Sequence, residues 1–174
     1  TEHYEPAFKR GIAELKADIE KIANNSEPAT FENTIVALDR SGELLNRVSG
    51  AFFNVLSANA NDEMMEISQR ISPDLTESSN NIYLNEKLFA RVKAVYDQRQ
   101  SLNLSVEDSR LLDETYRAFQ ESGATLSAED KEKYRALTTE LSLLSLQFDQ
   151  NALKDQNRFE MLLTDEKDIA GLPE

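Results

Sequence analysis

Apolar residues recur along most of the chain at alternating spacings of three and four, which is the period of one face of an α-helix. One such stretch, which the other segments are expected to cover, spans residues 30–59, with apolar positions at Phe31, Ile35, Leu38, Leu45, Phe52 and Leu56. A second apolar stripe beside it consists of Leu44, Val48, Phe53 and Val55. Because the two stripes form a wide band, the pattern predicts one long helix that neighbouring helices cover on several sides. Gly42 makes a break near Ser41 the alternative to a continuous helix.

Five further segments show the same period, and each begins near a residue suited to a helix start. These start residues are Pro6, Asp62, Asn85, Ser105 and Ser127. The first segment has an apolar face made of Phe8, Ile12, Leu15, Ile19 and Ile22. In the third of these segments, Leu84 before the cap is placed to pack on Phe89. The fourth has Leu112, Thr115, Tyr116 and Phe119 facing inward and Gly123 at its end.

The last of these segments predicts a long helix that extends as far as Asn157. Its apolar face consists of Tyr134, Leu137, Leu141, Leu144 and Phe148. In the segment that begins at Asp62, the adjacent methionines Met64 and Met65 are interpreted as residues that fill gaps in the core, with a soft, adaptable binding surface as the alternative. Pro73 in the same segment removes an intrahelical hydrogen bond, so a kink is expected there.

The pattern changes after this long helix. Residues 159–163 form a short apolar run typical of a strand, and Asp165 is suited to cap one more turn before Gly171-Leu172-Pro173. A single strand leaves its backbone groups unpaired, and no partner strand is evident in the chain. The prediction is therefore an all-α domain of long antiparallel helices over residues 1–158, about three quarters helical. A short strand follows, and residues 159–174 are expected to begin the next element of a larger protein.

Composition limits the possible partners. The 174 residues suit one domain, and 40% apolar with 29% charged residues is typical of a globular protein. A formal net charge of −13 repels phosphate backbones and anionic membrane surfaces, so neither nucleic acid nor membrane is an expected partner. No apolar run is long enough to span a bilayer, and no export signal is evident.

The chain lacks several residues that most enzyme sites require. The chain has no cysteine, which excludes thiolate metal sites and cysteine nucleophiles. Its one histidine, His3, lies near the end of the chain and has no second histidine one helical turn away. We therefore assign no catalytic, cofactor-binding or metal-binding residue and expect no cofactor in this chain.

Several short strings, in order, resemble the thimet oligopeptidase family of zinc metallopeptidases. The longest is residues 28–42, with the sequence PATFENTIVALDRSG. The others are His3-Tyr4-x-Pro6-Ala7-Phe8, Ile71-Ser72-Pro73, Leu84-Asn85-x-x-Leu88-Phe89, residues 141–151 with Leu146, Gln147, Phe148 and Asn151, and Gly171-Leu172-Pro173. Each string is weak alone, but their order and spacing cover nearly the whole chain. The resemblance is strongest to the bacterial peptidyl-dipeptidase branch, which removes dipeptides from free C-termini.

The resemblance implies a helical N-terminal region that forms one wall of a deep substrate channel. In the family, zinc is held by a His-Glu-x-x-His helix and a further Glu, hundreds of residues beyond this segment, so no site residue transfers to this chain. The implied partners are the catalytic part of the same polypeptide and short, unfolded peptides. The implied source is bacterial, in either the cytoplasm or the periplasm. The alternative is a free-standing helical module that binds a partner through an acidic surface or an apolar groove.

Overall fold

A computed structural model describes residues 1–163, 165, 167, 170 and 171, and each regular element among them is a helix. In chain order the elements are α1 (Tyr4–Ala23), the π-helix η1 (Phe31–Val36), α2 (Ala37–Asp39), α3 (Glu43–Asn59), α4 (Asp62–Tyr83), α5 (Glu86–Asp97), the 3-10 helix η2 (Arg99–Ser101), α6 (Val106–Glu121) and α7 (Ala128–Arg158). The predicted all-α fold with six main helices is confirmed for the described part of the chain. No helix in that part is both long and apolar enough to cross a membrane.

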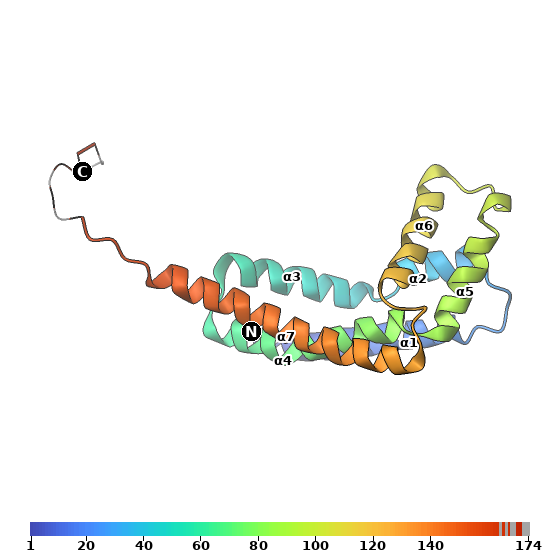
Figure 1. The fold of residues 1–174 in the computed structure, drawn as a ribbon, viewed down its shortest axis with the longest axis horizontal. Helices are drawn as coiled ribbons and strands as arrows, with labels where there is room; N and C mark the ends of the chain where they lie inside the picture. Colours follow the sequence, from blue (N-terminus) through green and yellow to red (C-terminus); the bar gives the residue numbers. More distant parts are fainter. Residues whose placement is uncertain (164, 166, 168–169, 172–174) are drawn as a thin grey trace.

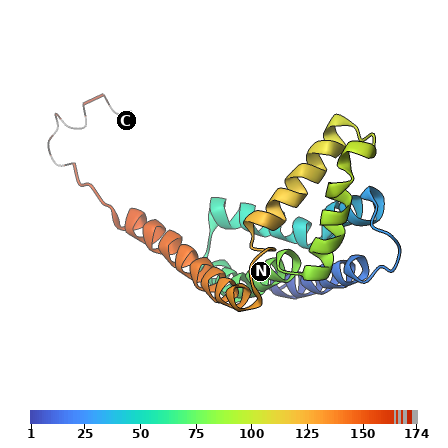
Figure 2. The ribbon, with the colours of Figure 1, turned by 45° about the vertical axis from the view of Figure 1, so that its right-hand side comes forward.

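The long helices form an elongated body, and a helical hairpin rises from one end of it (Figure 1). The body consists of α1, α3, α4 and α7, while α5 and α6 form the hairpin, as the rotated view also shows (Figure 2). Helix α1 packs against α3 on one side and α4 on another, and α4 in turn packs against α7. Helix α1 also contacts α5, so it connects the body to the hairpin.

The predicted continuous helix over residues 30–59 is wrong. The π-helix and α2 end at Asp39, and Gly42 adopts a left-handed backbone (φ 69°) before α3 begins. Helix α3 buries Leu45 and Phe52, but Phe53 and Val55 of the second stripe remain 40% and 42% exposed. The wide apolar band is thus covered mainly by α1, and α1 occupies the central position that the sequence pattern predicted for residues 30–59.

Side chains at the helix starts explain why the boundaries fall where they do. Asn85, Ser105 and Ser127 each accept a hydrogen bond from the backbone N–H three residues later, as predicted. Asn61, rather than the predicted Asp62, caps α4 by accepting from the N–H of Met64. Helix α4 continues through Pro73, and α6 ends before Gly123, whose φ of 86° favours glycine.

Arg91 of α5 fixes the loop between α1 and the π-helix. One guanidinium nitrogen donates to the carbonyl oxygens of Asn25 and Glu27 at 2.8 and 2.9 Å. The other donates to Oδ1 of Asn33, at 2.9 Å, whose side chain also forms a capping box with Thr30. The start of the segment 28–42 is therefore held by a side chain from a distant part of the sequence.

The predicted strand at residues 159–163 does not form. These residues have no regular secondary structure and are exposed, because no other described segment offers a strand to pair with them. The further turn predicted between Asp165 and Pro173 falls partly on residues that the structure does not describe, among them Leu172 and Pro173. The division of the chain at residue 158 stays a prediction, although α7 does end at Arg158.

Replacing Gly11 with alanine is expected to destabilise the fold, because α1 approaches α3 closely at this residue. A Cβ atom at position 11 would lie 2.9 Å from the backbone Cα of Leu45, which no side-chain movement can relieve. We expect Gly11→Ala to lower the free energy of unfolding by about 1 to 3 kcal/mol. Urea unfolding followed by far-ultraviolet circular dichroism measures the effect.

Gly50→Ala is the matched control, since Gly50 also lies within a helix but has no atom within 4 Å of an added Cβ. This control is expected to raise the stability by about 0.5 to 1 kcal/mol, because alanine favours the helix. Equal effects of the two substitutions would contradict the close approach of α1 and α3.

Candidate interaction surface

Helix α7 is the longest helix of the described chain, and it packs chiefly against α4. It lies along α4 and continues beyond the rest of the body toward the C-terminal end (Figure 1). Within α7, all of which is described, Lys131 is the one buried residue. One side of α7 therefore meets the body, and the opposite side faces solvent along most of its length.

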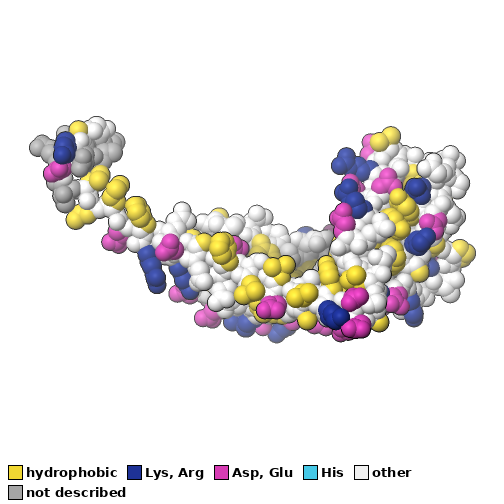
Figure 3. Space-filling view, viewed as in Figure 1, with side chains coloured by type: hydrophobic (Ala, Val, Ile, Leu, Met, Phe, Trp, Pro, Cys, Tyr) yellow, Lys and Arg dark blue, Asp and Glu magenta, His cyan; other side chains and the backbone are white. Residues whose placement is uncertain are grey.

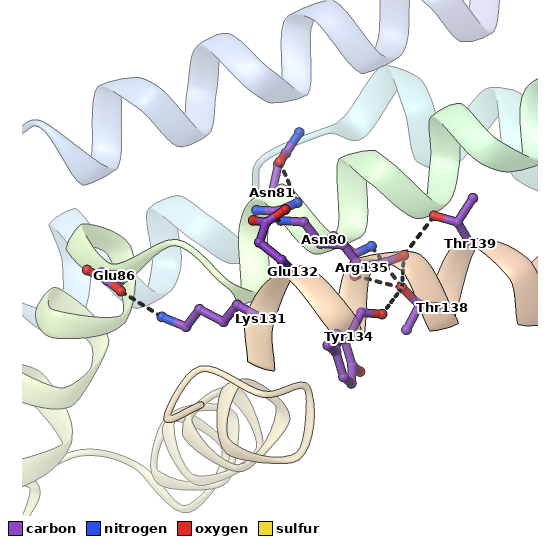
Figure 4. A network of polar contacts seen from close by, with 9 residues as sticks. All are labelled: Asn80, Asn81, Glu86, Lys131, Glu132, Tyr134, Arg135, Thr138 and Thr139. Atoms are coloured by element: carbon purple, nitrogen blue, oxygen red, sulfur yellow. Dashed lines mark hydrogen bonds and ion pairs between the residues drawn. The ribbon is translucent and has the colours of Figure 1, made fainter. Parts of the chain in front are cut away.

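The side of α7 that meets α4 is held by polar side chains. The Nδ2 group of Asn80, which is buried, donates to Oγ1 of Thr138 at 2.9 Å. Arg135 donates to Oδ1 of Asn81 at 2.9 Å, as the close view shows (Figure 4). Further along the helix, Gln69 donates to Gln150 at 2.6 Å. We call these three α4–α7 contacts the polar seam.

A buried lysine joins the start of α7 to the hairpin. The Nζ group of Lys131 lies 2.9 Å from Oε1 of Glu86, the first residue of α5 (Figure 4). The lysine side chain is almost fully buried, while the glutamate is exposed. A buried lysine without a partner is costly, so this ion pair helps to fix the first turn of α7 against α5.

The opposite side of α7 carries an exposed apolar row. Leu137, Leu141, Leu144 and Phe148 are 64%, 63%, 54% and 72% exposed. Their spacing of four, three and four residues places them in one line along the helix, and we call this line the outer face. Hydrophobic side chains are visible at intervals along this part of the molecule (Figure 3). Tyr134, the remaining residue of the predicted apolar face, is partly buried, but nothing in the described chain covers the other four.

A second group of exposed apolar side chains follows the end of α7. Phe159, Met161 and Leu162 are all exposed in the extended segment that follows Arg158. Groups of exposed apolar side chains, such as the outer face, are typical of a site that contacts another protein segment. The outer face and this segment are the strongest candidate for a functional surface.

The part of the chain that the structure describes offers no candidate metal site beside this surface. No group of three or more His, Cys, Asp and Glu side chains there could hold a metal ion. His3 lies at the start of α1, where its side chain is 92% exposed and 3.8 Å from the carboxylate of Glu2. The absence of catalytic and metal-binding residues from the chain stays a prediction from its sequence.

Ionisable side chains at the surface perform structural roles. Lys9 and Arg70 donate hydrogen bonds to Glu5 and lower the pKa of its carboxyl group. Because Arg70 belongs to α4 and Glu5 to α1, this contact adds to the packing of the two helices. Asp97 similarly raises the pKa of Lys93 through a hydrogen bond within one helix.

Comparison with known proteins identifies the relatives of the chain. No protein-family model matches it. Dipeptidyl carboxypeptidase of Escherichia coli is 41% identical over 172 residues, which is 99% of this chain and 25% of that protein. The enzyme of the same name from Salmonella typhimurium is 41% identical over 170 residues, 98% of this chain and 25% of that protein. Oligopeptidase A of Escherichia coli is 27% identical over 173 residues, 99% of this chain and 25% of that protein.

The homologues of the chain are thus peptidases of the thimet oligopeptidase family, and the resemblance noted in the sequence is confirmed. Within that family, the chain is homologous to part of dipeptidyl carboxypeptidase and of oligopeptidase A. It spans about a quarter of the length of these relatives.

Replacing Thr138 with valine is expected to weaken the polar seam. The buried amide of Asn80 would lose its acceptor, while the shape of the side chain at position 138 stays nearly the same. Leaving a buried donor unpaired costs about 1 to 3 kcal/mol, so the free energy of unfolding should fall by that amount. Urea unfolding measures the loss, and hydrogen exchange should show faster exchange of amides in α7.

The control is Thr139→Val, because the Thr139 hydroxyl donates to the carbonyl of Arg135 in its own helix. This change should stay within about 0.5 kcal/mol of the original stability. A Thr138→Val variant as stable as this control would show that the seam does not hold α7 in place.

Proposed function

We propose that the chain is the non-catalytic N-terminal region of a zinc metallopeptidase of the peptidyl-dipeptidase and oligopeptidase type. The observation that carries the proposal is 41% identity to dipeptidyl carboxypeptidase over 99% of the chain, which spans 25% of that protein. The exposed outer face of α7 supports it, since part of a larger fold is expected to leave apolar surface uncovered when considered alone. A self-contained interaction module would be expected to cover more of its own apolar surface.

In this proposal the helical body acts as a wall or lid of a substrate channel and leaves the chemistry to zinc in the catalytic part. One histidine cannot reproduce a His-Glu-x-x-His site, in which two histidines hold the metal and the glutamate acts on the bound water. A narrow channel admits only extended chains, so it selects short, unfolded peptides. Closing the wall around a peptide also removes water from the metal site.

Shape should dominate this selection over charge. The net charge of −13 attracts the positive N-terminus of a peptide, but salt screens the attraction beyond about 10 Å at ordinary ionic strength. The described helices contribute rigid surface through buried packing of α1, α3 and α4. Such a surface fits a role in which the body moves as a unit.

The isolated chain is expected to hydrolyse no peptide and to bind no zinc at one equivalent per chain. It has no cysteine and only His3 among its imidazole ligands, so a typical zinc site cannot be completed. Peptide hydrolysis followed by chromatography and zinc content measured after dilute chelator test the two expectations. Chelator-resistant zinc at one equivalent per chain, or peptide cleavage that co-purifies with the isolated chain, would contradict the proposal that the catalytic part of the polypeptide carries the chemistry.

Locking the region against the catalytic part is expected to block turnover in the full polypeptide. One cysteine is introduced in each part so that an engineered disulfide holds the channel closed, and short and long flexible peptides serve as substrates. Turnover of both should fall when the disulfide forms and recover on reduction, because substrate entry requires the parts to separate. The two single-cysteine variants are the controls. Equal turnover in the oxidised and reduced states would show that the region is not a lid.

A further inference from the structure

We propose that the outer face of α7 binds an amphipathic helix from the rest of the same polypeptide. The inference rests on the proposed function, because that function supplies the longer polypeptide, and it adds which surface joins the two parts. The residues that would make the contact are Leu137, Leu141, Leu144 and Phe148, all of them more than half exposed in the chain alone.

The spacing of these residues fits a helix as the occupant. Apolar residues four, three and four positions apart follow the heptad pattern of two helices that pack side by side at a shallow angle. The row is one residue wide, which matches the narrow seam of a helix pair better than the broad surface of a sheet. A partner helix with its own apolar row could cover all four side chains at once.

The outer face is not free to turn inward and cover itself. Turning α7 about its axis would separate Asn80 from Thr138 and Arg135 from Asn81, which now lie at hydrogen-bond distance. It would also place polar groups of α4 against leucine side chains, leaving them unpaired. The polar seam therefore holds the leucines outward, and only another segment can cover them.

The composition of this part of α7 also indicates a buried surface in the full protein. Between Ala136 and Ala152 the charged residues are Glu140 and Asp149, in a chain that is 29% charged. A helix that faces water on its outer side normally carries charges along that side. The low charge of this segment lowers the cost of covering it.

The rest of the polypeptide is a better occupant than a second copy of the chain. Four side chains fall well short of the about 1,200 Å² that a stable interface between separate proteins buries. Two copies would also each carry a net charge of −13. A covalently connected segment has a high effective concentration, so a small contact suffices. The relatives are long enough to contain such a segment, since this chain spans only 25% of their length.

Cysteine labelling tests the inference without relying on activity. The chain has no cysteine of its own, so Leu141→Cys or Leu144→Cys introduces the single thiol of this region, and that thiol lies on the outer face. Ala136→Cys is the control, because Ala136 is exposed on α7 but lies outside the apolar row. Each variant is prepared in the isolated chain and in the full polypeptide, and the rate of modification by a maleimide is followed by mass spectrometry.

We expect both outer-face cysteines to react at least about ten-fold more slowly in the full polypeptide than in the isolated chain, while position 136 reacts equally in both. Equal rates at 141 and 144 would overturn the inference. Equal protection at position 136 would also overturn it, because a single helix along the row cannot cover that side. Protection of the isolated chain that grows with its concentration would identify a second copy as the occupant instead.

Peptide hydrolysis by the unsubstituted full polypeptide separates the two claims. A polypeptide that protects positions 141 and 144 but cleaves no peptide would refute the proposed function and leave the contact in place. A polypeptide that cleaves peptides without protecting these positions would refute the contact alone.

Discussion

The close approach of α1 to α3 at Gly11 is the constraint on which the helical body depends. The absence of a side chain at this position lets the backbone at Leu45 come within contact distance of α1. Phe8, one turn earlier, then meets Phe52 edge to face, with ring centroids 5.4 Å apart. With α3 on one side, α1 presents its remaining apolar residues to α4 and α5, so the other helices are placed relative to this pair.

Much of the local structure follows from nearby residues and was predictable for that reason. Ser105 and Ser127 cap helices through hydrogen bonds that span three residues, so their effect is visible in a short window of sequence. The break near Gly42 was only the alternative to the preferred continuous helix, because an apolar period continues on both sides of it. The left-handed turn there brings Gly42 against the side chain of Leu15 in α1, a contact that only the folded chain reveals.

The candidate surface was predictable only in part. The period of Leu137, Leu141, Leu144 and Phe148 indicates an apolar face, but an apolar face in a sequence does not reveal whether anything covers it. The answer depended on Asn80, which selects the side of α7 that contains Thr138. No spacing rule links the two residues, since they lie in different helices. The strand expected at residues 159–163 failed for a similar reason, because a strand requires a partner and the described chain contains none.

The two sides of α7 have different physical roles. One side fixes the orientation of the helix, and the other provides apolar surface for binding. Polar contacts such as the one between Asn80 and Thr138 contribute little net energy, but a wrong rotation of the helix would leave them unpaired, so they select one orientation. Apolar side chains provide non-directional attraction in proportion to the area they bury. A helix held by polar groups on one side can therefore present leucines to a partner in a fixed line. In the function proposed above, this arrangement lets the helical region set the position of a second part of the polypeptide, as a wall that closes on a distant site requires.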